Sequence, residues 1–172
     1  MNKLDNSIYD LNAPDLAPLL LGKLLCVRTT QGDVIKARIT ETEAYFGEED
    51  TACHAHRGRT KRTEILYSKG GKVYVYLCYG IHSLMNIISG PAEHPQGVLI
   101  RGVEGINGPG KLTKQLGINC THNGIDITTS NIIWIEDDGF VPEQILTSPR
   151  IGINYATQEY RDKLWRFYYT NT

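Results

Sequence analysis

The sequence predicts one α+β domain over residues 1–172, built around a curved, mainly antiparallel β-sheet with a few short peripheral helices. Three observations favour this class. Short runs rich in β-branched and aromatic residues recur along the chain, separated by turn residues. Only two or three segments carry helical start and stop signals. A length of 172 residues suits one hydrophobic core and is too short for two ordinary domains.

The first half of the chain predicts a helix followed by a hairpin. Residues 13–22 begin with Ala-Pro-Asp and end in glycine, which is typical of a short helix. Residues 23–29 and 34–45 read as two strands joined by a Gln-Gly-Asp turn. Residues 47–62 then form a polar loop, whose composition we interpret as excluding it from the core.

The strongest strand signal is VYVYLCY at residues 73–79, which ends at a glycine. Side chains alternate along a strand, so Tyr74 and Tyr76 are expected on one face and Tyr79 on the other. The remaining predictions are strands at residues 83–89, 97–103, 131–136 and 164–169, a short segment at 149–155, and a Gly-rich turn leading into a helix at 108–117.

Composition and charge narrow the class of protein. Charged residues make up 22% of the chain, as in soluble globular proteins, and the first 23 residues have no long apolar core, so neither a signal peptide nor a membrane span is expected. The four cysteines lie far apart, which favours reduced thiols and a cytoplasmic location. The formal net charge is −1, yet residues 53–115 hold nine Lys or Arg against three acids. The middle of the chain is therefore basic and the remainder acidic, and a polyanion would bind at the basic region.

Residues 39–62 contain many of the side chains that are candidates for catalysis or binding. On the predicted strand, Glu41, Glu43 and Tyr45 share a face, with the two carboxylates roughly 6–7 Å apart. A half-buried pair of this kind needs a cation, hydrogen-bond donors or a proton, whereas a solvated edge face would need none. Asn86 and Arg101 each interrupt an apolar run further on, as structural side chains or as functional ones.

Five segments, in order, resemble the alkyladenine (3-methyladenine) DNA glycosylase family, the kind without a helix-hairpin-helix. They are TETEAYFGEEDTACHAHRGRT, YVYLCYGIHSLMN, VLIRGVE, GPGKLTKQLGIN and PRIGI, and the resemblance runs from about residue 16 to residue 168. It implies a monofunctional DNA repair enzyme that flips out and excises alkylated or deaminated purines such as 3-methyladenine, 7-methylguanine and hypoxanthine. The implied partner is double-stranded DNA. A monomer without cofactor, metal or membrane contact is expected, acting in the cytoplasm with the nucleoid.

The resemblance also implies roles for individual residues. The expected catalytic group is Glu43, which activates the attacking water, with Arg101 and the backbone carbonyl of Ile151 as further contacts of that water. The remaining expected contacts are Tyr45, His54, Tyr76 and Asn86 around the base, Tyr79 and Leu66 as intercalating residues, and Arg59, Thr60, Lys111 and Gly152 at DNA phosphates. Cys120 replaces a lysine of human-type members, so one phosphate contact is expected to be missing.

Elementary chemistry supports these implications. A base in duplex DNA must be rotated out of the stack before its glycosidic bond can be attacked. An aromatic slot stabilises the extruded base by roughly 1–3 kcal/mol per stacked base. A purine methylated at N3 or N7 carries a positive charge, so it is attracted to electron-rich rings and leaves without an acid. One carboxylate that activates water is then sufficient.

Two other classes of function remain open at this level. A metallohydrolase would use Cys53, His54 and His56, although no second cluster with ligand spacing follows. A non-catalytic nucleic-acid-binding module would use the same basic loops and tyrosines. The second class leaves Glu43 unexplained, because a carboxylate in a basic face repels phosphate.

Overall fold

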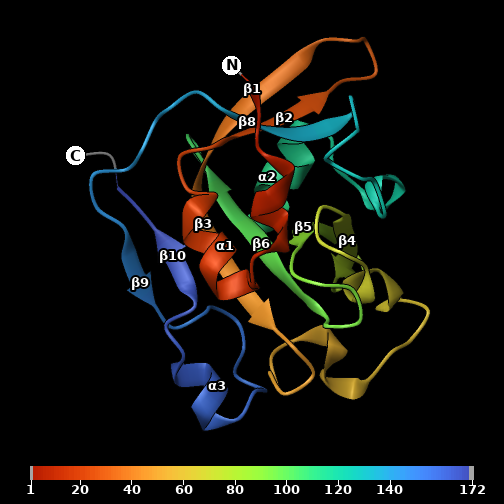
Figure 1. The fold of residues 1–172 in the computed structure, drawn as a ribbon, viewed down its shortest axis with the longest axis vertical. Helices are drawn as coiled ribbons and strands as arrows, with labels where there is room; N and C mark the ends of the chain where they lie inside the picture. Colours follow the sequence, from red (N-terminus) through yellow and green to blue (C-terminus); the bar gives the residue numbers. More distant parts are fainter. Residues whose placement is uncertain (1, 171–172) are drawn as a thin grey trace.

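The computed structural model describes residues 2–170, and its centre is a strongly curved antiparallel sheet (Figure 1). The strands are β1 (Asn2–Lys3), β2 (Leu24–Arg28), β3 (Val34–Phe46), β4 (Val73–Cys78), β5 (His82–Ile88), β6 (Gln96–Val103), β7 (Ile106–Asn107), β8 (Ile133–Asp137), β9 (Leu146–Ser148) and β10 (Arg166–Tyr168). The helices are α1 (Ala13–Leu19), α2 (Pro109–Leu116) and α3 (Gln158–Asp162). Short 3₁₀ turns are η1 (Asn6–Asp10), η2 (His54–Arg57), η3 (Glu64–Tyr67) and η4 (Cys120–His122).

The long strand β3 connects the two halves of the sheet. The strand order is β1-β8-β2-β3-β6-β5-β4, with β10 pairing both β3 and β9 and with β7 pairing β6. The first part of β3 pairs with β2, whereas residues 39–46 pair with β6 on one side and residues 41–43 with β10 on the other. The register with β6 shifts on both sides of Glu41, so β3 carries a bulge at the point where its partners change.

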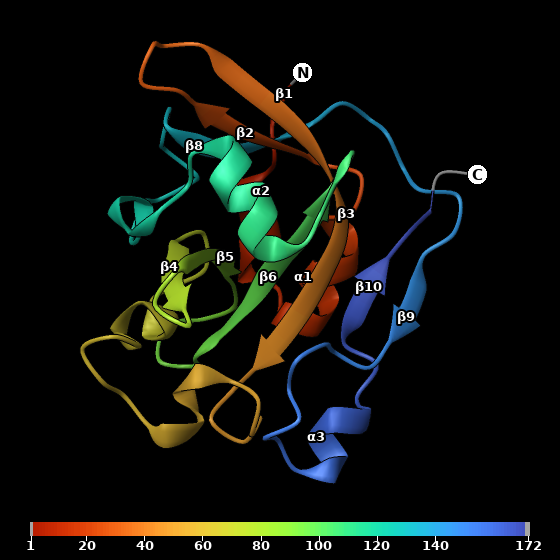
Figure 2. The same cartoon turned by 180° about the vertical axis from the view of Figure 1, so that it is seen from behind.

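Helices cover both sides of the central strands. Figure 1 shows α1 in front of β3 and β6, and Figure 2, turned by 180°, shows α2 in front of β5 and β6. The core combines Leu16 of α1 and Leu112 of α2 with Ile39, Ile87 and Ile100 of the sheet. Strand β6 is buried along nearly its whole length, which explains why its sequence reads as a continuous apolar run rather than an alternating one.

The predicted class, α+β around a curved antiparallel sheet, is confirmed, and each strongly patterned segment has its counterpart. The predicted strand at 131–136 begins only at Ile133, and the one at 164–169 shrinks to β10. The elements β1, β7, β9 and α3 are too short for a periodic signal, and residues 149–155 form neither a helix nor a strand. Among residues 2–170, none of the helices has both the length and the apolar character that crossing a lipid bilayer requires.

The interpretation of residues 47–62 as excluded from the core is wrong. Ala52, Cys53 and Ala55 are buried, and Asp50 is fully buried. The carboxylate of Asp50 accepts hydrogen bonds from the backbone N–H groups of Phe46 and Ala52 and forms an ion pair with Arg150. A partner 100 residues away therefore makes burial of this loop favourable, which its local composition does not reveal.

Candidate active site

A row of directly opposed residues crosses five strands and builds the site. From β10 to β4 the row is Arg166, Glu43, Leu99, Asn86 and Tyr74. Directly opposed residues on paired strands point to the same face of a sheet, so these side chains, drawn from distant parts of the sequence, project to one side. The opposite face of β3 carries Thr42, whose hydroxyl donates to a backbone carbonyl of α1.

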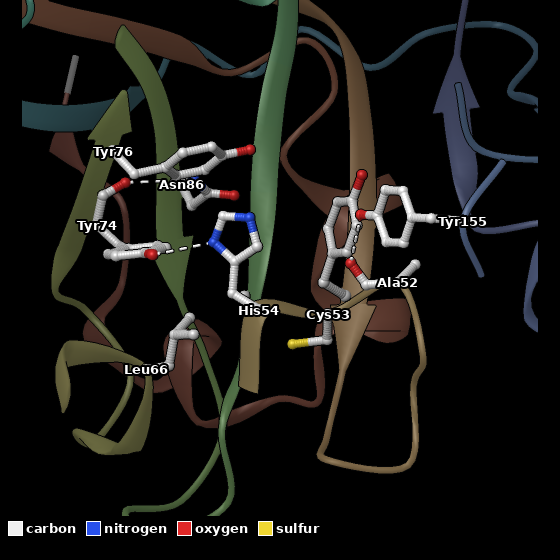
Figure 3. Close-up of a pocket in the computed structure, with 10 residues that line it drawn as sticks. Ala52, Cys53, His54, Leu66, Tyr74, Tyr76, Asn86 and Tyr155 are labelled. Carbon is white, nitrogen blue, oxygen red and sulfur yellow. Dashed lines mark hydrogen bonds between the residues drawn. The ribbon is translucent and has the colours of Figure 1, made fainter. Parts of the chain in front are cut away.

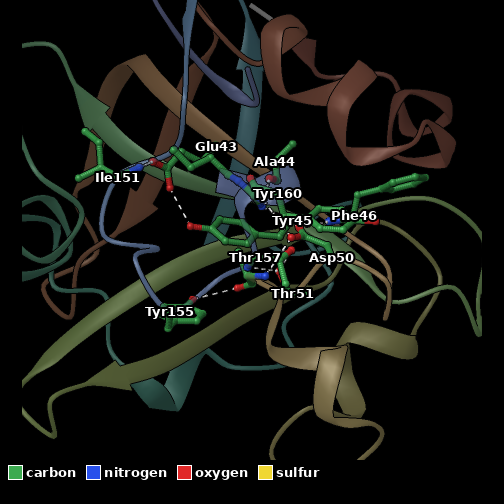
Figure 4. A network of polar contacts seen from close by, with 12 residues as sticks. Glu43, Ala44, Tyr45, Phe46, Asp50, Thr51, Ile151, Tyr155, Thr157 and Tyr160 are labelled. Atoms are coloured by element: carbon green, nitrogen blue, oxygen red, sulfur yellow. Dashed lines mark hydrogen bonds and ion pairs between the residues drawn. The ribbon is translucent and has the colours of Figure 1, made fainter. Parts of the chain in front are cut away.

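Glu43 is fully buried at the centre of this row, and both of its carboxylate oxygens are engaged (Figure 4). Oε2 accepts a hydrogen bond from the Tyr45 hydroxyl at 2.8 Å. Oε1 accepts one from the backbone N–H of Ile151 at 2.7 Å and lies 3.6 Å from Nε of Arg101. The alternative of a solvated edge face therefore does not describe Glu43.

Opposing influences act on the ionisation of Glu43. Burial raises the pKa of its carboxyl, and the charge of Arg101, the Ile151 N–H, the Tyr45 hydroxyl and the charge of Arg150 lower it. Burial is the largest of these influences, so the carboxylate is a stronger base than a solvated glutamate. A buried carboxylate with this balance can accept a proton from water near neutral pH.

The neighbouring carboxylate, Glu41, serves a different purpose. Its Oε1 accepts hydrogen bonds from Nε of Arg101 at 2.9 Å and from Nε of Arg166 at 2.7 Å. Arg101, which was expected as a contact of the water on Glu43, makes its shorter contact with Glu41. Glu41 thus anchors two guanidinium groups, while the hydrogen bonds to Glu43 come from uncharged donors and Arg101 lies farther away, at 3.6 Å.

An aromatic-walled cavity of about 40 Å³ adjoins this network (Figure 3). Four of the residues predicted to contact a base line it together, namely Tyr45, His54, Tyr76 and Asn86. The other lining residues were not predicted for this place and are Ala52, Cys53, Leu66, Tyr74, Gly97 and Tyr155. The alternation along β4 could have identified Tyr74, because it shares a face with Tyr76, whereas no local signal marks Tyr155.

His54 is held as a neutral side chain in this wall. Its Nδ1 lies 3.0 Å from the Tyr74 hydroxyl, and its ring packs edge-on against Tyr76 with centroids 4.3 Å apart. Burial, helped by the charge of Arg62, lowers the pKa of His54 to about 4. An uncharged imidazole adds no repulsion against a cationic ligand in the cavity.

The cavity adjoins an open cleft of about 830 Å³. Tyr45, Arg101 and Ile151, all in contact with Glu43, line the cleft, so the carboxylate lies directly beneath its floor. The cleft wall is rich in basic side chains and glycines, which come from the loop before η3, from β5 and β6, from α2 with the residue before it, and from the segment after Arg150. Among its lining residues are Arg62, Lys111, Lys114, His82, Gly108, Gly110 and Gly152.

Tyr79 stands at the rim of the cleft on the tip of the β4–β5 hairpin. Its side chain is 92% exposed, and its backbone is left-handed with φ of 52°. The residue follows the end of β4, so the alternation predicted for this strand does not extend to it. An unsupported aromatic side chain on a tight turn is typical of a group that gains its contacts from a partner.

Two of the predicted site residues make contacts that the sequence did not indicate. Leu66 is only 4% exposed and packs in the cavity wall, a position that differs from the surface position expected of an intercalating residue. The N–H of Ile151 donates to the Glu43 carboxylate, while the expected role of its carbonyl beside the attacking water stays a prediction. Neither contact could be read from the chain, because each depends on tertiary structure.

The remaining phosphate candidates differ in how available they are. Lys111 is exposed in the first turn of α2 and lines the cleft, as does Gly152. Arg59 is exposed but forms a two-pronged ion pair with Glu93, and Thr60 exchanges hydrogen bonds with Thr63. Lys111 and Gly152 are therefore the candidates that face the cleft directly.

The metal alternative gains no support from the positions of its donors. Nδ1 of His54 faces the Tyr74 hydroxyl, whereas Nδ1 of His56 lies 2.7 Å from the backbone carbonyl of Glu48. Within residues 2–170, no three His, Cys, Asp or Glu side chains converge as a metal site requires.

Comparisons with known proteins agree with this geometry. The family model described as methylpurine-DNA glycosylase matches residues 7–107 and 105–172. A protein of Borrelia garinii subsp. bavariensis is 42% identical over 96% of this chain and 95% of its own length, and one of Psychrobacter cryohalolentis is 45% identical over 88% and 84%. A protein of Clostridium perfringens (strain SM101) is 41% identical over 96% and 95%, and all three are provisionally named 3-methyladenine DNA glycosylases. The chain therefore belongs to the methylpurine-DNA glycosylase family, the DNA repair enzymes that hydrolyse N-glycosyl bonds.

Proposed function

We propose that the protein removes alkylated and deaminated purines, among them 3-methyladenine, 7-methylguanine and hypoxanthine, from double-stranded DNA. A water activated by Glu43 attacks the sugar carbon and leaves an abasic site. The observation that carries this proposal is a buried carboxylate beside an aromatic cavity, directly beneath the floor of an open basic cleft. The cleft receives the duplex and the cavity receives the base.

Extrusion of the base requires a group that fills the space it leaves. Tyr79 fits this role because it is exposed on a hairpin tip at the rim of the cleft. The extruded purine stacks between Tyr45 and His54, with Tyr76 beside it. Asn86 lines the same cavity and screens against guanine. A neutral His54 suits a methylated purine, which carries a positive charge in its ring.

For a cationic base such as 3-methyladenine or 7-methylguanine, the bond changes balance without a further group, whereas neutral hypoxanthine also needs a proton donor for the departing base. The oxygen of water forms a bond to C1′ of the sugar, and its proton passes to Glu43. The C1′–N bond breaks, and its electron pair neutralises the departing cationic base. Glu43 and Arg101 surround the reacting water, and no lysine replaces the acid as a nucleophile, so the enzyme acts without lyase chemistry. A monomer is proposed to act on the nucleoid DNA of the cytoplasm.

Substitution of Glu43 by glutamine tests the proposal. Glu43→Gln keeps the size of the side chain and an acceptor for the Ile151 N–H, yet it cannot take a proton. Binding of a duplex that carries one 7-methylguanine is expected to persist while release of the free base is lost. Glu41→Gln is the matched control, two residues away on the same strand face, and retains measurable release. Turnover by Glu43→Gln would transfer the catalytic role to Glu41, and absence of release by the native enzyme would refute the assignment.

A further inference from the structure

The cavity is too small for the base it is proposed to receive. Its volume is about 40 Å³. Small-molecule sites usually measure about 300–1,000 Å³. The cavity opens into the cleft, and Tyr45, His54, Tyr76 and Tyr155 line both spaces. A purine that enters from the cleft therefore has to pass between these shared side chains.

Tyr45 is the shared side chain that also covers the catalytic carboxylate. Its hydroxyl lies 2.8 Å from Oε2 of Glu43, and the backbone of Ile151 covers Oε1, so no part of Glu43 is exposed. A water cannot approach Oε2 from the cleft while the hydroxyl remains there. Burial and the charge of Glu43 raise the pKa of Tyr45, so the tyrosine stays protonated and acts as the donor.

The two interactions that Tyr45 would exchange are of similar size. The hydroxyl makes one hydrogen bond to a charged acceptor, and a base stacked on the ring makes an interaction of similar strength. The rest of the ring packs on a fixed support, because the guanidinium of Arg150 lies 4.8 Å from its centroid and is itself paired with Asp50. A small tilt of the ring on this support is sufficient to break the contact with Oε2.

We propose that the Tyr45 hydroxyl occupies the water-binding position of Glu43 in the free enzyme and that an extruded purine, by stacking on the Tyr45 ring, displaces it. This inference rests on the proposed function. Water is then admitted to Glu43 only when a base fills the slot. Tyr45 thus acts as a positioning residue that couples recognition of the base to activation of the water.

The charged and titratable groups around Glu43 come from several elements and stay in place in this exchange. Arg101 of β6 faces Oε1, and Glu41 and Arg166 lie beyond it. The charge of Arg150 also acts on Glu43, whereas the nearby Tyr76 and Tyr155 stay protonated and uncharged because burial raises the pKa of each. Of all these groups, only Tyr45 makes a side-chain hydrogen bond with the Glu43 carboxylate among residues 2–170. Its hydroxyl can therefore be removed without altering the other contacts.

The test compares Tyr45→Phe with the native enzyme in single-turnover excision of 7-methylguanine from a duplex, across a pH series. This base carries a fixed positive charge, so the fall in rate at acid pH reports protonation of a group of the enzyme and not of the base. Rates at subsaturating enzyme report groups of the free protein, and rates at saturating enzyme report groups of the complex. The hydroxyl lowers the pKa of Glu43 in the free protein, so its loss moves the acid limb of the subsaturating profile to higher pH. The saturating profile stays where it is, because the base has already displaced the hydroxyl.

Tyr155→Phe is the matched control. It removes a hydroxyl from the same cavity, one that donates to the Ala52 carbonyl and not to Glu43, so neither acid limb moves. Equal shifts in both profiles of Tyr45→Phe would mean that the hydroxyl stays on Glu43 during catalysis, and absence of any shift would mean that it never governs Glu43. Either result overturns the inference about Tyr45. The proposed function is tested separately, by whether the native enzyme excises the base at all. Thermal unfolding of each variant verifies that it is folded.

Discussion

The buried ion pair between Asp50 and Arg150 holds the site together, and its removal should unfold the protein more readily than any surface change. Both side chains are fully buried. Nη1 of Arg150 lies 2.7 Å from Oδ2 of Asp50, and Nη2 lies 2.9 Å from Oδ1. The guanidinium also donates to the carbonyls of Ala44 and Tyr160. The pair thereby joins the end of β3, the loop that carries His54 and the segment that carries the Ile151 N–H.

The expected cost follows from burial. Removing one partner of a buried pair leaves an uncompensated charge and costs about 3–5 kcal/mol. For a chain of this size each kcal/mol lowers Tm by about 2–4 °C, so Asp50→Asn or Arg150→Met should lower Tm by roughly 6–20 °C. The double variant removes both charges, although it leaves the N–H groups of Phe46 and Ala52 with weaker acceptors. It should therefore be less destabilised than the sum of the single variants, by roughly 1–3 kcal/mol.

Urea unfolding of the native protein, the two single variants and the double variant measures this coupling. The pair formed by Arg38 and Asp138 is a matched control, because it is also an Arg–Asp pair with two hydrogen bonds. Its side chains are 18% and 19% exposed, so water screens the charge that remains after one partner is removed and the loss is smaller. Additive effects of Asp50→Asn and Arg150→Met, or a cost below about 1 kcal/mol for each, would refute the view that the pair organises the site.

Three further predictions concern the pH dependence of stability, the role of Tyr79 in filling the space left by the base, and the contact of Lys111 with a phosphate. Burial raises the pKa of Glu43 in the folded protein, so protonation of Glu43 contributes fully to stability below the unfolded pKa, and this contribution is lost as pH rises through the folded pKa. The Tm of Glu43→Gln minus that of the native protein should therefore grow as pH rises through this window. A difference in Tm that stays constant with pH would contradict the raised pKa. Tyr79→Ala should slow excision from duplex DNA more than from single-stranded DNA, because only in a duplex must a side chain fill the space that the extruded base leaves. Equal losses of rate on both substrates would count against this role of Tyr79. Lys111→Ala should reduce the dependence of log Kd on log salt by about one unit, as measured by DNA titration at several salt concentrations, if the cleft-lining amine binds a phosphate.

Much of the fold is encoded locally. Runs of β-branched and aromatic residues located the principal strands, and the alternation along β3 placed Glu43 and Tyr45 on one face, where their side chains meet at 2.8 Å. The same alternation put Tyr74 and Tyr76 together, and both line the cavity. These predictions succeed because the geometry of an extended strand relates neighbours in sequence directly to neighbours in space.

Contacts made at long range escape such reasoning. The loop after β3 is buried because Asp50 meets Arg150, and the Glu43 carboxylate is held by a backbone N–H 108 residues away. Backbone amides leave no trace in the residue type, so the position of Ile151 predicts nothing about its N–H. Periodicity likewise cannot reveal Arg166 as a partner of Glu41, since β10 is only three residues long.

The different roles of Glu41 and Glu43 are the clearest example of a feature that depends on long-range contacts. Both are glutamates on one strand face, and local sequence gives them equal status. Strand β10 separates them, because Arg166 stands opposite Glu43 in the register but directs its guanidinium to Glu41. Arg101 lies near both carboxylates but closer to Glu41, and Arg166 contacts Glu41. Glu43 is left ionisable in a neutral cluster and bound mainly by uncharged donors, so it remains basic enough to accept a proton.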